Sequence, residues 1–253
     1  MNKKDVRIQS MIRELSLRPE QSVAELAALF QVSQMTIRRD LQYIEQNRLL
    51  RPEILHGGRT AGASRYEYLE EEIRNAEQKR RIAEFALGLL KPGEIVALDS
   101  GTTAGMLAAV IPDDMPLTVI CYSYYIVSKL YDRSNIDLIL AGGYYHHNTQ
   151  TFESTEGMQF LKQLRARKMF LCASGVHETM GITCTDQHIA SMKRAALSIS
   201  SEKILLCDSS KFGEIRSGFI SSLEDLDMIV TDQGISPAWE SRLRETGAEV
   251  HIV

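Results

Sequence analysis

The segment of residues 22–40, SVAELAALFQVSQMTIRRD, constrains the fold of this chain more than any other. It holds two short helical patterns, each preceded by a serine, with a polar turn between them. Ser22 followed by Glu25 is typical of a capping box, in which the serine oxygen and the carboxylate bind backbone N–H groups left free at a helix start. Ser33 is a second candidate N-cap. The segment therefore predicts two consecutive helices joined by a tight turn.

The second predicted helix has an apolar face and a polar, basic surface. Its apolar residues recur at helical spacing and are Ile37, Leu41 and Ile44. The remaining side chains of its first two turns can reach base edges and phosphates if the helix enters a major groove by its N-terminal end. A corner of a helical bundle with solvated arginines is the alternative. The candidate DNA-binding residues are Ser33, Gln34, Met35, Thr36, Arg38 and Arg39.

Two flanking segments extend this helix pair into a predicted domain over residues 1–59. Apolar residues at helical spacing between residues 8 and 15 predict a preceding amphipathic helix, which ends before a proline. The stretch 48–59, RLLRPEILHGGR, predicts a β-hairpin wing in which Arg51 and Arg59 would lie along DNA phosphates. The N-terminal domain is therefore predicted to be a winged helix-turn-helix.

The charge of the chain is divided unevenly. The formal net charge is -4, yet residues 1–59 carry ten Lys and Arg against seven Asp and Glu, and the rest carries nineteen against twenty-six. A basic front and an acidic body suit a protein whose N-terminal domain meets a polyanion. No apolar run approaches the ~18 residues of a membrane span, and the N-terminus lacks the apolar core of a signal peptide. A cytoplasmic protein is expected.

The four cysteines show no CxxC spacing and are expected to be small buried apolar residues in a reducing compartment. The absence of metal-ligand spacing argues against a zinc or redox site. Neither a metal nor a cofactor is expected, and no residue is singled out as catalytic. The cysteines are Cys121, Cys172, Cys184 and Cys207.

The remainder of the chain predicts an α/β domain over residues 74–253. Residues 60–73 contain a charged run without an apolar period and are expected to form an interdomain linker. Residues 76–90 predict a helix on which Lys79, Arg80 and Arg81 would belong to a solvated face or, as the less favoured alternative, touch DNA or effector. Further on, short apolar runs alternate with helix-length segments, which is typical of a mostly parallel sheet covered on both faces. The predicted strands are 95–98, 117–121, 136–141, 169–173, 204–207, 228–231 and 250–253.

Small, hydroxylated or charged residues follow nearly every predicted strand, and open parallel sheets bind ligands beyond the carboxyl ends of their strands. The Ser-Gly-Thr-Thr turn after Asp99 opens a helix and therefore favours an anion such as a phosphate, although Ser and Thr are also ordinary helix caps. Lys211 would add a positive charge from a second loop. Asp99 itself either binds a sugar hydroxyl or only caps its turn. The candidate effector-binding residues are Asp99, Ser100, Gly101, Thr102, Thr103, Tyr122, Ser123, Gly142, Gly143, Gly175, His177 and Lys211.

The sequence resembles the DeoR family of bacterial transcriptional regulators along almost its entire length. The stretch VSQMTIRRDL, residues 32–41, is similar to the family's helix-turn-helix, and the match continues into residues 56–58. In the second domain the turn at Asp99, the later Gly-Ile-Thr segment, Lys193 and the DSSKFG stretch at residues 208–213 follow the family's order. The resemblance implies a sensor domain with the fold of ribose-5-phosphate isomerase and the glucosamine-6-phosphate deaminases.

The resemblance also implies a function. DeoR-like repressors bind double-stranded operator DNA and respond to a phosphorylated sugar. The segments around Tyr122, Gly175 and Lys211 are similar to those of the family's deoxyribonucleoside operon repressors, so deoxyribose 5-phosphate is the first candidate effector. A homo-oligomer, dimer or higher, is expected because one small head buries too little surface for specific binding.

Two alternatives stay open at this point. The first is a sugar-phosphate isomerase-like enzyme with a DNA-binding appendage. Gln187-His188-Ile189 stands where family members usually carry glutamates, which makes catalysis less plausible. The second alternative is an activator, or a regulator that senses another phosphorylated metabolite.

Overall fold

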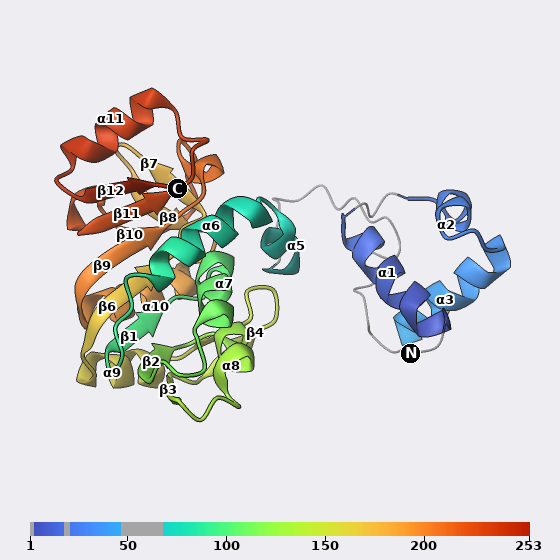
Figure 1. Cartoon of the computed structure of the whole chain (residues 1–253), viewed down its shortest axis with the longest axis horizontal. Coiled ribbons are helices and arrows are strands. Elements are labelled where there is room, and N and C mark those ends of the chain that lie inside the picture. Colours follow the sequence, from blue (N-terminus) through green and yellow to red (C-terminus); the bar gives the residue numbers. More distant parts are fainter. Residues whose placement is uncertain (1–2, 18–20, 47–67) are drawn as a thin grey trace. The chain divides into compact units, whose positions relative to one another are not determined.

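The computed structural model describes residues 3–17, 21–46 and 68–253 of the chain, which are drawn in colour in Figure 1. The chain divides into two compact units, the N-terminal unit (Met1–Ser64) and the C-terminal unit (Arg65–Val253). Within the described ranges, no helix is both long and apolar enough to cross a membrane.

The described part of the N-terminal unit consists of three helices around a small apolar core. The capping box predicted at Ser22 is confirmed: its hydroxyl accepts a hydrogen bond from the backbone N–H of Glu25 at 3.2 Å, and the Glu25 carboxylate accepts one from the backbone N–H of Ser22 at 2.7 Å. The predicted wing over residues 48–59, with Arg51 and Arg59, lies outside the described residues. The helices are α1 (Lys3–Leu17), α2 (Val23–Leu29) and α3 (Gln34–Gln46).

An ion pair and an apolar face fix α3 in this unit. The predicted face is confirmed, because Ile37 and Ile44 are fully buried and Leu41 is half-buried against the same core. On the same side, Oδ2 of the buried Asp40 lies 2.6 Å from Nε of Arg7 in α1. These contacts determine which side of α3 faces the core, and therefore which side faces solvent.

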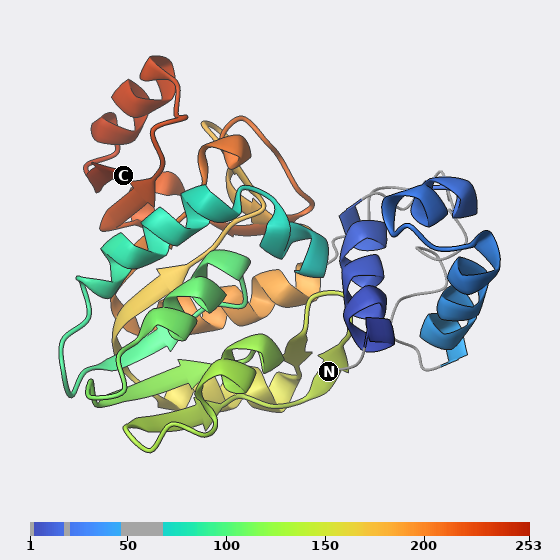
Figure 2. The ribbon, with the colours of Figure 1, turned by 45° about the vertical axis from the view of Figure 1, so that its right-hand side comes forward.

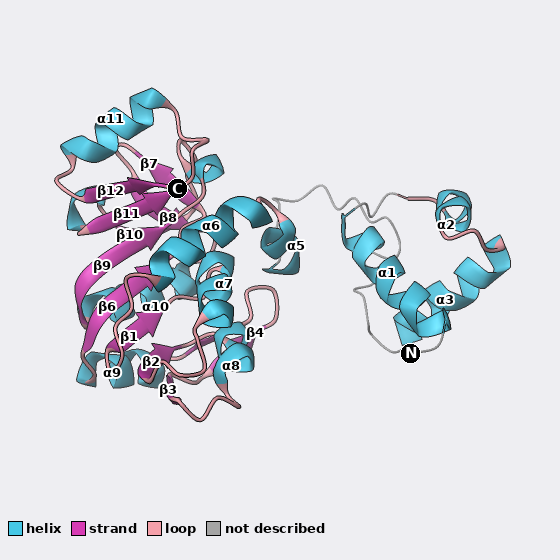
Figure 3. Ribbon diagram, in the orientation of Figure 1, coloured by secondary structure: helices cyan, strands magenta, loops and turns pink. Residues whose placement is uncertain are grey.

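The C-terminal unit is built on the parallel sheet that the apolar runs predict. All seven predicted strands are present, and every neighbouring pair in the order β12-β11-β9-β6-β1-β2-β3 runs parallel (Figure 3). Strands distant in the sequence are therefore neighbours, and the loops after them share one edge of the sheet. The strands are β1 (Ile95–Leu98), β2 (Leu117–Cys121), β3 (Ile136–Leu140), β6 (Ala166–Leu171), β9 (Ser200–Leu206), β11 (Met228–Thr231) and β12 (Glu249–Ile252).

Helices cover both faces of this sheet. Alternate residues of each strand point to opposite faces, so neighbouring residues of one strand belong to different cores. Val96 and Leu98 of β1 belong to a core with α6, α7 and α8, whereas Ala97 belongs to a core with α9, α10 and α11. Figure 2 shows α6 in teal and α7 in green lying together over one face. The helices are α6 (Ala76–Leu87), α7 (Thr102–Val110), α8 (Tyr124–Leu130), α9 (Thr155–Gln163), α10 (Gln187–Ser198) and α11 (Pro237–Glu245).

Two small antiparallel sheets accompany the main sheet, and the sequence patterns do not predict them. One pairs β4 with β5, and the other has the order β10-β8-β7. Strands of three or four residues contain too few positions to show an alternating pattern. These short elements, with two 3-10 turns, are β4 (Tyr144–His146), β5 (Thr151–Glu153), β7 (Gly175–His177), β8 (Gly181–Cys184), β10 (Gly218–Ser221), η1 (Ser209–Lys211) and η2 (Leu223–Asp225).

The linker predicted over residues 60–73 is wrong at its C-terminal end. Its last six residues form α5 (Tyr68–Ile73), a helix of the C-terminal unit. Tyr68 is only 2% exposed, and the centroid of its ring lies 4.7 Å from that of Tyr125 in α8. Single side chains such as Tyr68, rather than a continuous apolar face, hold α5 against distant parts of the unit. The sequence of α5 therefore shows no apolar period.

Candidate functional site

The carboxylate of Asp99 lies directly after β1, at the edge where the carboxyl ends of the parallel strands meet. Asp99 is completely buried. One oxygen accepts hydrogen bonds from the backbone N–H of Ser100 at 2.7 Å and from the hydroxyl of Tyr122. The other oxygen accepts one from the backbone N–H of Cys172 at 2.7 Å and forms an ion pair with Lys193. Both oxygens are therefore occupied by the protein itself.

Lys193 reaches this carboxylate from α10, and its Nζ also donates to the carbonyl oxygen of Cys172 at 3.0 Å. Burial lowers the pKa of Lys193, but the charge and hydrogen bond of Asp99, together with the nearby thiols of Cys184 and Cys172, outweigh burial, so the pKa lies above its ordinary value. Burial, together with the charge of Asp99, raises the pKa of Tyr122 well above its usual range. The network therefore holds a protonated Tyr122 and a charged Lys193.

In this structure the buried carboxylate of Asp99 holds the turn after β1 in place through its protein partners. Its contact with a sugar hydroxyl stays a prediction. Lys193 completes the cluster but is not among the candidate residues that the strand-end rule selects. A lysine in the middle of a helix gives no sequence signal that its ammonium group is buried against an aspartate.

The Ser-Gly-Thr-Thr turn leads from Asp99 into α7, with Gly101 as its N-cap residue. Ser100, Thr102 and Thr103 are all buried. The first backbone N–H groups of an α-helix have no acceptor within the helix, and the helix dipole makes this end favourable for an anion. The turn therefore lies at the start of a helix, where an anion is favoured, and binding of an anion there stays a prediction. Its hydroxyls are less accessible than the sequence pattern suggests.

Gly101→Ala tests how closely this turn is packed. A β-carbon at residue 101 would lie 2.2 Å from Cβ and 2.5 Å from Sγ of Cys172. We expect the substitution to lower the free energy of unfolding by about 1–3 kcal/mol, as overpacking does in other proteins. Urea denaturation measures the effect. Gly142→Ala is the matched control, because a β-carbon there meets nothing within 4 Å, and equal stability losses in the two variants would contradict the packing argument.

Two further lysines lie at this edge, and both bind Glu71 of α5. Nζ of Lys211 lies 2.8 Å from Oε2 of Glu71, and Nζ of Lys79 donates to the backbone carbonyl of the same residue. Lys79 is 2% exposed, so the prediction that it belongs to a solvated face of its helix is wrong. Burial is the main cause that lowers its pKa, and the charges of Asp208 and Glu71 partly oppose that effect.

Asn75, the second residue after α5, also contacts the loop after β9. Asn75 has a left-handed backbone conformation (φ 52°) and donates from Nδ2 to Oδ1 of Asp208 at 2.8 Å and to Oγ of Ser210 at 3.1 Å. Asp208 in turn caps η1 by accepting from the backbone N–H of Ser210 at 3.2 Å. The loop that carries Lys211 is thus held by residues before β1 as well as by its own turn.

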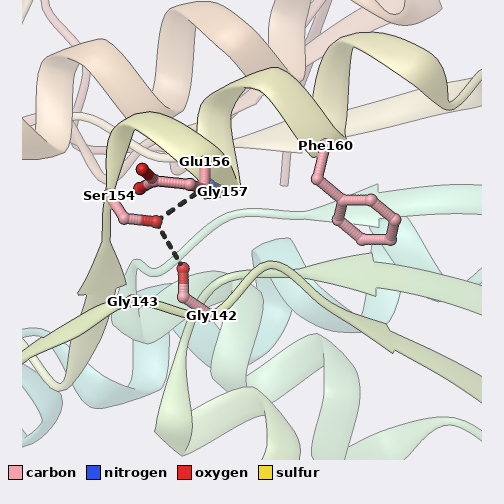
Figure 4. Close-up of a pocket in the computed structure, with 6 residues that line it drawn as sticks. All are labelled: Gly142, Gly143, Ser154, Glu156, Gly157 and Phe160. Atoms are coloured by element: carbon pink, nitrogen blue, oxygen red, sulfur yellow. Dashed lines mark hydrogen bonds between the residues drawn. The ribbon is translucent and has the colours of Figure 1, made fainter.

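Gly142 and Gly143 lie at the same edge of the sheet, after β3, and line an open pocket of about 430 Å³. Ser154, the N-cap residue of α9, donates from its hydroxyl to the carbonyl of Gly142 at 3.0 Å and accepts from the backbone N–H of Gly157 at 2.8 Å (Figure 4). Gly143 has φ 147°, and a β-carbon there would lie 2.3 Å from the carbonyl oxygen of Glu153. Gly143 therefore permits a close backbone approach beside this pocket, whereas a β-carbon at Gly142 would meet nothing within 4 Å.

The other predicted effector residues have structural partners of their own. Ser123 is buried and caps α8 by accepting from the backbone N–H of Ile126. Gly175 begins β7, where a β-carbon would lie 2.5 Å from the carbonyl oxygen of Glu214. Nδ1 of His177 accepts hydrogen bonds within its own turn, from the backbone N–H groups of residues 179 and 180 at 3.3 and 3.4 Å. These contacts account for the three residues without a ligand.

The solvent-facing side of α3 carries the predicted DNA-binding side chains. Ser33 caps α3, and its hydroxyl forms a hydrogen bond with the hydroxyl of Thr36 at 2.9 Å. Thr36 is half-buried. Met35 is 57% exposed although it is apolar. Exposed polar side chains flank it at the first two turns. They are Gln34, Arg38 and Arg39.

Comparison with known proteins assigns both units. Residues 7–64 match the DeoR-like helix-turn-helix domain, and residues 74–233 match the DeoR C terminal sensor domain. The chain belongs to the DeoR family of transcriptional regulators. It is 31% identical over 234 residues to the deoxyribose operon repressor of Escherichia coli (strain K12), covering 91% of each chain.

Other DeoR-type relatives cover similar lengths. The uncharacterized HTH-type transcriptional regulator YulB of Bacillus subtilis (strain 168) is 31% identical, over 98% of this chain and 96% of its own. The transcriptional repressor AccR of Agrobacterium fabrum (strain C58 / ATCC 33970) is 33% identical over 89% of each chain. Among solved structures, ribose 5-phosphate isomerase A of Methanocaldococcus jannaschii aligns over 55% of each chain with 18% identity and a TM-score of 0.42. That likeness carries no information about substrate or activity.

Membership of the DeoR family makes this chain a DNA-binding regulator rather than an enzyme. The Asp99 cluster consequently belongs to a sensor domain. Burial, reinforced by the charge of Asp99, raises the pKa of the Cys172 thiol to about 12. The thiol therefore stays protonated at neutral pH, as a structural cysteine does. All four cysteines are free and buried, as predicted.

Proposed function

We propose that this DeoR-family regulator represses a sugar or nucleoside catabolic operon and leaves its operator when a phosphorylated sugar binds. The observation that carries the proposal is the pair of lysines Lys79 and Lys211, whose ammonium groups both contact Glu71 at the sheet edge where ligands of open parallel sheets bind. The names of two relatives, as operon repressor and transcriptional repressor, support repression. The first of them makes deoxyribose 5-phosphate the first candidate effector.

The phosphate of the effector fits this edge for two physical reasons. The free N–H groups and the dipole at the start of α7 favour an anion. Lys211 adds an ammonium group from the loop after β9, and an ammonium is a common partner for phosphate oxygens. Asp99 and Lys193 neutralise one another, so they position the turn without opposing the phosphate charge.

The N-terminal unit would bind operator DNA through the start of α3. We propose that Gln34, Thr36 and either Arg38 or Arg39 contact bases, while further arginines contact phosphates. One such head buries too little surface for specific binding, so the regulator should act as a dimer or higher homo-oligomer on repeated or inverted half-sites. As a bacterial-type operon regulator it would work in the cytoplasm, where the DNA is.

Arg39→Ala should weaken operator binding by about 1–3 kcal/mol if this arginine reads a base. The side chain is exposed early in α3, so its loss should leave the fold and effector binding intact. A gel-shift titration measures the change in operator affinity. Arg13→Ala is the matched control, because Arg13 is an exposed arginine of α1 in the same unit. Unchanged operator affinity in the Arg39 variant would contradict the proposed contact.

A thermal-shift screen against phosphorylated sugars tests the effector. A ligand that binds only the folded state raises its stability by mass action, by about 2.7 kcal/mol at a hundredfold excess over Kd. Deoxyribose 5-phosphate should raise the melting temperature, and unphosphorylated deoxyribose should not. An equal response to both sugars, or to no phosphorylated sugar in the panel, would contradict a phosphate-centred site.

A further inference from the structure

Helix α5 is fastened to the loops of the proposed effector site at both of its ends. The hydroxyl of Tyr68 donates to the carbonyl of Gly101, the N-cap residue of α7, at 3.4 Å. The hydroxyl of Tyr125 in α8 donates to the carboxylate of Glu72. The bonds of Asn75 to the loop after β9 complete this set. A helix of only six residues, too short to be stable by itself, is therefore held by its contacts with the loops and helices around the site.

The charged contact of α5 lies at the cation proposed to hold the phosphate. Oε2 of Glu71 is 2.8 Å from Nζ of Lys211, and the two side chains are 16% and 13% exposed. Burial by itself would raise the pKa of Glu71, but the hydrogen bond and charge of Lys211, with the charges of Lys79 and Arg74, together outweigh burial, so the pKa is lowered. Glu71 is consequently an anion at neutral pH, and this protein carboxylate already occupies the ammonium group of Lys211.

A phosphate and Glu71 cannot both use Lys211 at low cost. The positive charges near this position are Lys211, Lys79 and Arg74, whose Nε lies 3.5 Å from the other carboxylate oxygen of Glu71. Arg74 is 62% exposed, so water screens its charge more than that of the two lysines. Asp208 lies close enough to influence Lys79 electrostatically. With Glu71 in place the two lysines face two carboxylates. A phosphate with its own negative charge would therefore meet repulsion from Glu71 as long as α5 stays docked.

We propose that α5 is a latch in which Glu71 competes with the effector phosphate for Lys211, so that effector binding expels α5 from the sensor domain. The inference rests on the proposed function and names the residue through which the site is regulated. Tyr68 is the first described residue after the stretch 47–67, which leads in sequence from α3 to the sensor domain. Release of α5 thus alters the segment that joins the sensor domain to the helix-turn-helix, and operator affinity falls.

The latch predicts an unusual behaviour for Glu71→Gln in the full-length protein. Without the carboxylate, phosphate and a docked α5 no longer exclude one another. The variant should bind deoxyribose 5-phosphate more tightly than the unchanged protein, by about 5–150-fold, the range of typical couplings between two sites. It should nevertheless remain on its operator when the sugar phosphate is added, because the same coupling drives release.

Affinity can be followed through the single tryptophan of the chain. Trp239 packs against Phe212, with ring centroids 5.3 Å apart, and Phe212 directly follows Lys211. Titration of Trp239 emission with deoxyribose 5-phosphate gives Kd, and a gel shift gives release from the operator. Glu84→Gln is the matched control, because Glu84 is an exposed glutamate of α6 that pairs with Arg80. It should leave both measurements unchanged.

Hydrogen exchange of residues 68–75 separates the latch from simple ligand binding. Ligands ordinarily slow exchange around their site. Deoxyribose 5-phosphate should instead accelerate exchange in residues 68–75 of the unchanged protein, and should have no such effect in Glu71→Gln. Slower exchange in these residues, or unaltered affinity of the Glu71→Gln variant for deoxyribose 5-phosphate, would overturn the latch. A phosphate-dependent response of Trp239 would still support the proposed function in that case. Absence of any response to the sugar phosphate would defeat both.

Discussion

Replacing Lys193 with methionine should lower the free energy of unfolding of the sensor domain by about 3–5 kcal/mol. The substitution removes the only opposite charge that the structure places against the carboxylate of Asp99 within the described residues, and Asp99 is completely buried. An uncompensated buried charge costs far more than the loss of an exposed ion pair, because neither water nor a counter-ion can stabilise it. Urea denaturation followed by circular dichroism measures the loss.

Lys162→Met is the matched control for this prediction. Lys162 is an exposed residue in the last turn of α9, and surface substitutions of this kind change stability by about 0.5 kcal/mol or less. If Lys193→Met cost no more than Lys162→Met, the ion pair with Asp99 would not be the element that holds the turn after β1. The native carbonyl partner of Lys193, on Cys172, also loses its donor, so the measured cost includes that hydrogen bond.

Replacing Lys211 with alanine should give a repressor that stays on its operator when the phosphorylated sugar is added. The variant loses the ammonium group proposed to bind the phosphate, and hydrogen bonds to charged groups contribute about 1.5–3 kcal/mol each. A gel shift with increasing deoxyribose 5-phosphate measures release, and the thermal-shift response to the same compound should weaken in parallel. Helix α5 keeps its bonds through Tyr68, Glu72 and Asn75, so the free protein should still bind DNA.

Lys91→Ala serves as the control for Lys211→Ala, because Lys91 is an exposed lysine outside the proposed site. Normal release in the Lys211 variant would show that the phosphate binds elsewhere on the sensor domain. The Lys211→Ala and Glu71→Gln variants should both fail to leave the operator, but for opposite reasons. The first should bind the sugar phosphate weakly and the second tightly, so measured affinities distinguish the two.

Local patterns in the sequence predict much of this fold. The capping box at Ser22 and the apolar spacing of α3 determine the helix pair of the N-terminal unit, because a helix repeats every 3.6 residues. The seven apolar runs determine the strands of the main sheet, because strands buried on both faces have apolar residues at successive positions. The rule that ligands lie beyond the carboxyl ends of such strands then places Asp99, Tyr122 and Lys211 at one edge.

The sequence alone does not determine how the groups at that edge pair with one another. Asp99 follows the first strand and Lys193 belongs to a late helix, and Glu71 and Lys211 are still further apart in the chain. No spacing rule relates such positions, because their distance depends on the strand order and on how each helix packs.

Lys79 is a further example of a position that the sequence alone does not determine. The helical pattern assigns its side chain to solvent, but the side chain is buried and donates to Glu71 of α5. Helix type and strand type follow from short-range repetition along the chain. The saturation of Asp99, the burial of Lys79 and the occupation of Lys211 by Glu71 follow only from the tertiary structure, because each is an electrostatic partnership between side chains that folding brings together.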